Sequence, residues 1–385
     1  MSRRGVGRWD GAILAFGATV VVASEFIVIG LAPPMAQSFA LTLEQAGWFV
    51  TSFALGSAML GPFAALAARS LRADRAMLGA LLPFSAAMLV PLFGQAWCFC
   101  LLRVVQGAAL PLFISVAGDT LGRVWGNDAR ATARLYLGVV FGSMFAAPAG
   151  AALADLVGWQ PCFELLGAVT LLAMIGILIR KPLRVRPVSG NGLRDDVALL
   201  ASPAVRRHLL VSLAHFAAMF CTYAFLAGIL QQDGVAAHAT GGWLLLFGLA
   251  GAVGNIAAGR LSAEKTRVGA VFTITVLSLA SLALPWLGSA PFLLPAVLCA
   301  WGAAHSASFV ICQLRVTRSA PAAPRLAAAL NISAANFGIA GGSMAGGQAL
   351  AAGGLPGLSA AGLALCAVTL ALALGAPYRT AASSA

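Results

Sequence analysis

Apolar stretches of about 20 residues follow one another along this chain, separated by short polar segments. Each stretch is long enough to cross a bilayer as an α-helix. A membrane β-barrel is excluded, because its strands would alternate apolar and polar residues over short segments. The pattern predicts twelve transmembrane helices, at 11–35, 46–68, 76–95, 97–121, 132–155, 160–180, 208–231, 241–261, 268–287, 291–315, 326–352 and 357–376.

The composition agrees with a chain that lies mostly in lipid. Hydrophobic residues make up 60% of the 385 residues and charged residues only 9%, whereas ordinary globular domains are about 25% charged. A soluble domain of this composition would have too little polar surface to cover its exterior. The predicted class is therefore an all-α integral membrane protein, with the lipid bilayer as its main partner.

One connection differs from the others. Residues 181–207 contain Pro182, Pro187 and several charges but few large apolar side chains, which predicts a cytoplasmic linker. The linker divides the chain into an N-terminal bundle at 1–180 and a C-terminal bundle at 208–385, each with six predicted helices. Similar charged motifs follow the second helix of each bundle, Arg69-x₄-Asp74-Arg75 and Arg260-x₃-Glu264-Lys265. Two pseudo-symmetric six-helix bundles are typical of one large class of transporters.

The basic residues fix the expected topology. The net charge is +12, and 23 of the 24 Lys and Arg residues precede the first span, follow the last, or lie in or within three residues of every second connection. The positive-inside rule places these segments and both termini in the cytoplasm, in a multi-pass protein of the cell's inner membrane. The positive net charge is therefore explained by the membrane topology, and no nucleic-acid partner is expected.

The sequence shows no motif for a metal site, for ATP binding or for a serine hydrolase. The seven cysteines show no metal-ligand spacing with histidine, so no metal is expected. No Gly-rich loop ending in Lys-Ser or Lys-Thr is present for ATP, which argues against an ATP-driven pump, and no cofactor is expected. Ser212 and His215 lie close in sequence, which keeps an intramembrane enzyme as a remote alternative, but no Gly-x-Ser-x-Gly elbow accompanies them.

Two charged residues stand out because they lie farther from the ends of their predicted spans than the other charged residues do. Glu25 is 14 residues into the first helix, about 21 Å from the cytoplasmic side at 1.5 Å per residue. Arg103 is six residues into a helix that enters from outside, so both lie about 10 Å below the outer face of a core about 30 Å thick. Their equal depth predicts that the two side chains approach each other or share one cavity.

This pair has two readings. A buried carboxylate is costly unless it is protonated, paired or wet, and arginine stays charged throughout, so Glu25 is the group that can gain and lose a proton. If the proton and a solute compete for this carboxylate, the pair supports exchange of one for the other. The alternative is a static buried salt bridge that braces two helices.

Other polar residues inside the spans are candidates for lining a substrate cavity. They are Gln106, His215, Tyr223, His305, Gln313, Asn331 and Asn336. Amides and a phenol suit recognition of neutral polar solutes, but such residues also hydrogen-bond helices to one another. The fifth helix contains Gly138, Gly142, Pro148 and Gly150, which predicts either a contact between the two bundles or plain tight packing.

In their order along the chain, several short motifs resemble the major facilitator superfamily and, within it, the arabinose-efflux-permease-like branch of drug:proton antiporters. They are Ser24-Glu25-Phe26, Gly30-Leu31-Ala32-Pro33, Gly47 to Thr51, Phe53 to Gly56, Pro62, Arg103-x-x-Gln106-Gly107, Ala147-Pro148-Ala149-Gly150, Gly158-Trp159, Phe163, Phe247-Gly248, Gly254-Asn255, Gly259-Arg260, Trp301-Gly302 and Asn336-Phe337-Gly338.

The resemblance implies alternating access around a central cavity, with Glu25 as the proton carrier and Arg103 as its modulator. It also implies an antiporter motif on the fifth helix, at Gly142, Pro148 and Gly150, and a cytoplasmic gating loop in which Arg69 and Arg72 pair with Asp119. The chain departs from the family's motifs at four positions, where it has Ala68, Leu71, Ala147 and Gln160.

The expected function is therefore proton-coupled efflux, by antiport, of a small organic solute such as a drug, sugar or metabolite, and not catalysis. A uniporter or a proton-symporting importer on the same fold remains an alternative. A monomer suffices for this function.

Overall fold

The computed structural model describes residues 8–125, 128–180, 201–262, 264–288, 290–320 and 324–375, and these residues contain helices and no strand. The predicted linker at 181–207 lies outside the described residues except for its last seven positions. The first group of helices is α1 (Arg8–Ser38), α2 (Leu43–Ala46), α3 (Trp48–Leu55), η2 (Gly56–Leu60), α4 (Gly61–Ala67), η3 (Ala68–Ser70), α5 (Ala73–Ser85), η4 (Ala86–Leu92), α6 (Ala96–Trp125), α7 (Asp128–Val157) and α8 (Trp159–Ile179).

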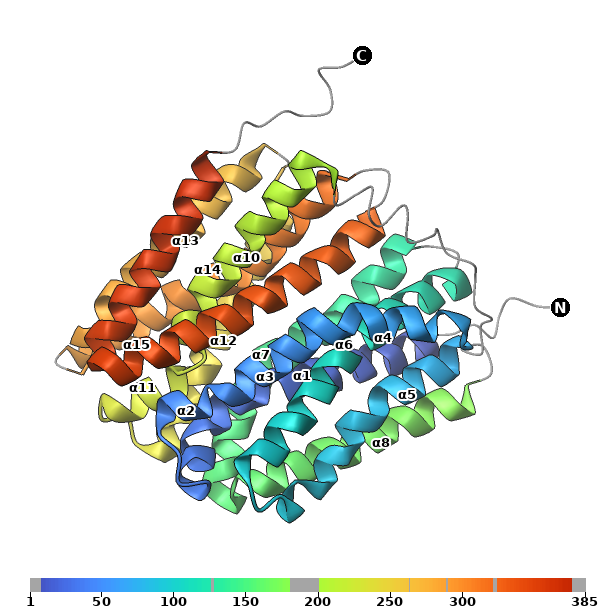
Figure 1. Cartoon of the computed structure of the whole chain (residues 1–385), viewed down its shortest axis with the longest axis horizontal. Coiled ribbons are helices and arrows are strands. Elements are labelled where there is room, and N and C mark those ends of the chain that lie inside the picture. The colour runs from blue at the N-terminus through green and yellow to red at the C-terminus, as the bar shows by residue number, and fades with distance from the viewer. Residues whose placement is uncertain are drawn as a thin grey trace.

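The second group follows the undescribed segment. It consists of α10 (Pro203–Tyr223), α11 (Leu226–Gln232), α12 (Ala237–Gly259), α13 (Lys265–Ala283), η6 (Leu284–Trp286), η7 (Pro291–Leu293), α14 (Leu294–Arg318) and α15 (Pro324–Leu374). Figure 1 shows most of α1 to α8 gathered on one side of the molecule and most of α10 to α15 on the other. We call these the N-terminal and C-terminal groups.

Ten helices in the described residues are long and apolar enough to cross a membrane, so the chain is a multi-pass membrane protein. The segment predicted at 46–68 is helical but divided, because α3 passes into the π-helix η2 and then into α4. The last two predicted spans form one element, α15, which is interrupted where Gly353 and Gly354 leave helical geometry. Gly354 has φ of +58°, a conformation that glycine adopts without strain, and the chain turns back there (Figure 1).

Glycine lets helix backbones touch within each group. In the N-terminal group Gly138 and Gly142 of α7 face the backbone of α1 at Ala15 and Thr19. In the C-terminal group, Gly338, Gly342 and Gly346 of α15 face the α10 backbone in the same way. Small residues at such contacts allow the close packing that holds helices together in lipid. The glycines of the fifth predicted span therefore pack within one group rather than between the two.

The two ends of the helices differ in charge. One end, which we call the arginine-rich end, holds the start of α1 and the ends of α8 and α14. There the Arg180 Nε donates to Asp10 Oδ1 at 2.6 Å, a hydrogen bond that raises the pKa of Arg180. The connections at the opposite end contain no Lys or Arg, for example 39–47 and 233–236; we call it the arginine-free end.

Contacts between the two groups gather toward the arginine-free end. Thr51 of α3 and Ser343 of α15 hydrogen-bond through their hydroxyls at 2.7 Å, and both residues are buried. In the C-terminal half of α7, Ala152 lies beside Gly241 of α12. The groups are therefore closed against each other at this end.

Candidate functional site

A cavity of about 340 Å³ lies between the two groups. The N-terminal group contributes α1, α6 and α7 to its wall, and the C-terminal group contributes α10, α12, α14 and α15. From Tyr223 and Pro148 the lining extends to Tyr136, Gln313 and Asn331, which lie near the arginine-rich ends of their helices. The polar side chains in the lining are Glu25, Tyr136, Ser143, Tyr223, Asn255, His305, Ser306, Gln313, Asn331 and Asn336.

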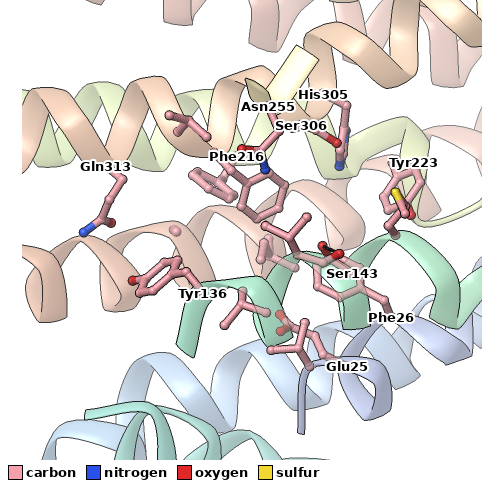
Figure 2. Close-up of a pocket in the computed structure, with 18 of the residues that line it drawn as sticks. Glu25, Phe26, Tyr136, Ser143, Phe216, Tyr223, Asn255, His305, Ser306 and Gln313 are labelled. Atoms are coloured by element: carbon pink, nitrogen blue, oxygen red, sulfur yellow. Dashed lines mark hydrogen bonds between the residues drawn. The ribbon is translucent and has the colours of Figure 1, made fainter. Parts of the chain in front are cut away.

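Glu25 is the only charged residue in this lining. In Figure 2 its carboxylate points from α1 into the space between the helices, and Asn255, His305 and Ser306 lie across that space. Within the part of the chain that the structure describes, the carboxylate has no hydrogen-bond or ion-pair partner, although the residue is half-buried. A single unpaired acid therefore faces the cavity.

Arg103 lies beside Glu25 but behind the cavity wall, fully buried on α6. Its guanidinium donates to the backbone carbonyl of Glu25 at 3.0 Å and to that of Ser24 at 2.6 Å. It also donates to the Phe49 carbonyl at 3.2 Å, and it lies 4.3 Å from the centre of the Phe53 ring. The two charged residues approach each other as expected, but the contact is to the backbone of Glu25 rather than to its carboxylate.

Gln106 belongs to this buried network and is absent from the cavity lining, contrary to the expectation from the sequence. Its Oε1 lies 3.3 Å from both the Arg103 Nη1 and the Ser24 hydroxyl, and its Nε2 donates to the Pro83 carbonyl at 3.2 Å. The amide therefore joins α1, α5 and α6. Further along α6, Leu110 and Ile114 reach the cavity instead.

The two histidines of the C-terminal group have different surroundings. His215 Nε2 pairs with the Ser308 hydroxyl at 2.8 Å, and the ring does not line the cavity. The partner of His215 is therefore Ser308 rather than the nearby Ser212, whose hydroxyl has no hydrogen-bond partner among the described residues. His305 does line the cavity, is only 3% exposed, and neither ring nitrogen has a hydrogen-bond partner among the described residues.

The predicted amides also lie in the cavity wall. Asn331 Nδ2 donates to Gln313 Oε1 at 2.7 Å, which joins α15 to α14. Asn336 Nδ2 donates to the Ile332 carbonyl of its own helix at 2.9 Å. The Oδ1 atoms of both asparagines have no partner among the described residues. Tyr223 stacks on Phe247, with ring centres 5.0 Å apart.

The predicted gating and antiporter residues are separated in the structure. Arg72 forms its ion pair with Asp74, at 2.7 Å, rather than with Asp119, and Asp119 pairs with Arg123 on its own helix. Arg69 lies in η3, and its side chain is outside the described part of the structure. Of the antiporter-motif residues, Pro148 lines the cavity, whereas Gly142 and Gly150 face α1.

Four polar lining residues were not among the predicted cavity residues: Tyr136, Ser143, Asn255 and Ser306. Two of them could have been recognised from the sequence, because Ser306 is adjacent to His305 and Asn255 belongs to one of the family-like motifs. Tyr136 and Ser143 carried no such signal, because nothing in a uniformly apolar helix marks the face that turns toward the cavity.

A cavity enclosed between two groups of membrane-spanning helices defines the chain as a membrane transporter of the kind built from two helix bundles. The sequence profile of the Major Facilitator Superfamily matches residues 14–347. The chain belongs to this superfamily, as its motifs indicated.

Curated relatives cover most of the chain at low identity. The inner membrane transport protein YdhP of Escherichia coli K12 is 26% identical over 353 residues, which are 88% of each chain. A chloramphenicol resistance protein of Streptomyces lividans is 28% identical over 382 residues, or 97% of each chain. A probable sugar efflux transporter of Mannheimia succiniciproducens is 27% identical over 369 residues, covering 93% of this chain and 91% of that one.

Solved structures show the same fold. A bacterial homologue of the human lysosomal transporter Spinster, described as inward-facing and unoccupied, aligns with a TM-score of 0.73 at 16% identity, over 96% of this chain and 95% of that one. The human organic anion transporter MFSD10 aligns with a TM-score of 0.66 at 18% identity, over 95% of this chain and 99% of that one.

Proposed function

We propose that the protein is a proton-coupled exporter, which exchanges protons for a small organic solute by alternating access. The observation that carries this proposal is the unpaired carboxylate of Glu25 in a cavity between two helix groups. A carboxylate in apolar surroundings is costly as an anion, so it favours an exchangeable proton or a bound solute. The names of the relatives, for sugar efflux and for chloramphenicol resistance, support export.

The topology we propose has twelve crossings and both termini in the cytoplasm. The divided helix α3–η2–α4 supplies one crossing, and the turn at Gly353 and Gly354 makes two crossings of α15. The positive-inside rule then places the arginine-rich end in the cytoplasm. With the groups closed at the arginine-free end by contacts such as Thr51–Ser343, the conformation is the inward-facing one.

Glu25 and Arg103 have separate roles in this cycle. Arg103 is held by backbone carbonyls of α1 and α3, so it keeps a positive charge at a fixed place near Glu25. A proton that enters from outside neutralises Glu25, and its complete passage across the membrane releases about 2.3 kcal/mol per 100 mV of membrane potential. Once the groups rock to the inward-facing state, the proton leaves toward the cytoplasm and the solute takes its place.

Transport in proteoliposomes tests the role of Glu25. With a pH gradient imposed, the unaltered protein is expected to move a test solute, chloramphenicol or arabinose, against its concentration gradient. Glu25→Gln keeps the size of the side chain but cannot release a proton, so gradient-driven transport is expected to fall to background. The matched control is Glu164→Gln, because Glu164 of α8 is exposed and outside the cavity.

Two results would decide against this function. Undiminished gradient-driven transport by Glu25→Gln would remove the proposed proton carrier. Movement of the solute only down its own gradient, in the unaltered protein, would favour a uniporter, and movement in the same direction as the proton would favour an importer.

A further inference from the structure

The C-terminal side of the cavity is lined by aromatic rings. Its aromatic wall consists of Phe216, Tyr223, Phe247, His305 and Phe309. His305 lies at the centre of this wall, with its ring 4.3 Å from that of Tyr223, 5.5 Å from Phe247 and 5.7 Å from Phe309, measured between centres. Aromatic rings in contact prefer offset or edge-to-face arrangements at these distances. The cavity in front of the wall therefore offers a flat ring of a solute the same kind of contact.

The same side of the cavity presents polar atoms that the protein leaves unused. Both nitrogens of His305 and the Oδ1 atoms of Asn331 and Asn336 lack a partner among the described residues. The three side chains are 3%, 3% and 5% exposed. A buried polar atom without a hydrogen bond destabilises the protein, and this cost is removed when a ligand supplies the missing bond.

The spacing of these groups sets the size of such a ligand. Along α14, His305 and Gln313 are eight residues apart, which is about 12 Å at 1.5 Å per residue. Gln313 in turn is hydrogen-bonded to Asn331. A molecule with a ring against the aromatic wall and a polar substituent toward these amides would span this length.

We propose that the aromatic wall binds an uncharged aromatic solute whose hydroxyl or amide substituents hydrogen-bond to His305 and to the asparagines of α15. This inference deepens the proposed function, on which it rests, by naming the substrate class. A sugar fits less well, because most of the lining is apolar and would leave several hydroxyl groups without partners. An anionic solute also fits less well, because the described lining contains no Lys or Arg and the Glu25 carboxylate faces the same space.

Binding to the purified protein in detergent tests this inference without a proton gradient. Three probes separate the contributions: chloramphenicol, an uncharged arene with hydroxyl and amide groups; nitrobenzene, a similar ring without them; and arabinose, which has hydroxyl groups without a ring. Chloramphenicol is expected to bind most tightly to the unaltered protein, as measured by calorimetry or ligand-induced thermal shift.

The decisive variant is His305→Phe, which keeps a ring in the wall and removes both nitrogens. Chloramphenicol is expected to bind it about tenfold more weakly, the effect of one well-placed hydrogen bond, while nitrobenzene binding stays unchanged. Because His305 donates no hydrogen bond to the described residues, the ligand-free variant is expected to melt at the same temperature as the unaltered protein. The matched control is His238→Phe, at an exposed position near the start of α12.

A second variant, Asn336→Leu, is expected to weaken chloramphenicol binding to a similar extent. The proposal is overturned by unchanged chloramphenicol binding in both variants, by tighter binding of arabinose than of chloramphenicol, or by no binding of chloramphenicol at all. These outcomes are distinct from a failure of proton coupling. Suppose that Glu25→Gln loses coupled transport and that arabinose binds more tightly than chloramphenicol. The proposal of a proton-coupled exporter would then stand, and the proposal of an aromatic substrate would be rejected.

Discussion

The N-terminal and C-terminal groups share a scaffold but differ in the chemistry they place at the cavity. In the N-terminal group the buried Arg103 has its donors satisfied by carbonyls of Ser24, Glu25 and Phe49 and by Gln106. In the C-terminal group His305 has rings around it and no hydrogen bond to the described residues. Arg103 therefore uses its donors inside the N-terminal group, whereas the His305 nitrogens at the cavity have no partner among the described residues.

The difference suggests how one repeated fold divides its tasks. The hydrogen-bond network around Arg103 holds the backbone near Glu25 in place, because moving that backbone would break several of these hydrogen bonds at once. An unsatisfied set of polar atoms costs stability, and it is retained where binding restores the missing bonds. Proton coupling and solute recognition are, in our proposal, assigned to opposite walls of one cavity.

The largest predicted effect is the loss of Arg103. Arg103→Ala removes several hydrogen bonds from a charged donor and leaves a cavity between α1, α3 and α6. Removing one partner of such a buried charged network typically costs about 3–5 kcal/mol, so a clear drop in melting temperature in detergent is expected. His305→Phe, in contrast, is expected to leave the ligand-free melting temperature unchanged.

Arg260→Ala provides the comparison for this measurement, because Arg260 is exposed at the end of α12. Equal melting temperatures for the variants at Arg103 and Arg260 would show that the buried network does not stabilise the N-terminal group. That result would remove the contrast between the two walls.

The shared scaffold yields a second prediction, of intermediate size. Gly138→Val and Gly342→Val each place a branched side chain against the backbone of the neighbouring helix, at Ala15 in α1 and at Ala217 in α10. A backbone cannot move aside as a flexible side chain can, so each variant is expected to lose about 1–3 kcal/mol of stability. Thermal melting should show similar losses in the two groups.

Gly242→Val is the control, because a side chain added at Gly242 of α12 meets open space. A much larger loss in one group than in the other would mean that the repeated helix contacts are not equivalent. The scaffold would then differ between the groups as much as the chemistry does.

The sequence predicted the helices better than the site. Apolar runs set the spans, so the first was expected at 11–35 and is observed as α1 (Arg8–Ser38). Counting residues also predicted that Arg103 approaches Glu25, and it does, through the backbone carbonyl of Glu25. Counting residues along the chain could not show that the Gln106 amide hydrogen-bonds between α1, α5 and α6, because these bonds depend on how the helices cross.

The rest of the site depended on contacts between distant parts of the chain. Helices in lipid are apolar on all sides, so no amphipathic stripe marks the face toward the cavity. Tyr136 lines the cavity only because α7 crosses between α1 and α12. The spacing of the fifth-span glycines likewise predicted a close contact, but not that its partner would be α1.

The smallest predicted effect concerns the contact that holds the two groups together at the arginine-free end. Thr51→Val combined with Ser343→Ala removes both hydroxyls of the buried hydrogen bond. Each hydroxyl otherwise bonds only to a carbonyl of its own helix, Gly47 or Ala340, so the fold is expected to remain stable. The closed state alone loses a bond worth about 1 kcal/mol, which shifts the ratio of closed to open molecules about fivefold.

Spin labels measure this shift directly when they are attached to cysteines introduced at Gln45 and Gln348, which flank the contact in a small surface pocket. The double variant should increase the population with a long distance between the labels, relative to the labelled parent. Thr275→Val serves as the control, since the Thr275 hydroxyl bonds only to its own helix, at Val271, and is exposed. An unchanged distance distribution in the double variant would mean that the glycine and aromatic contacts nearby, such as Gly47 against Phe225, close this end without help from the hydroxyls.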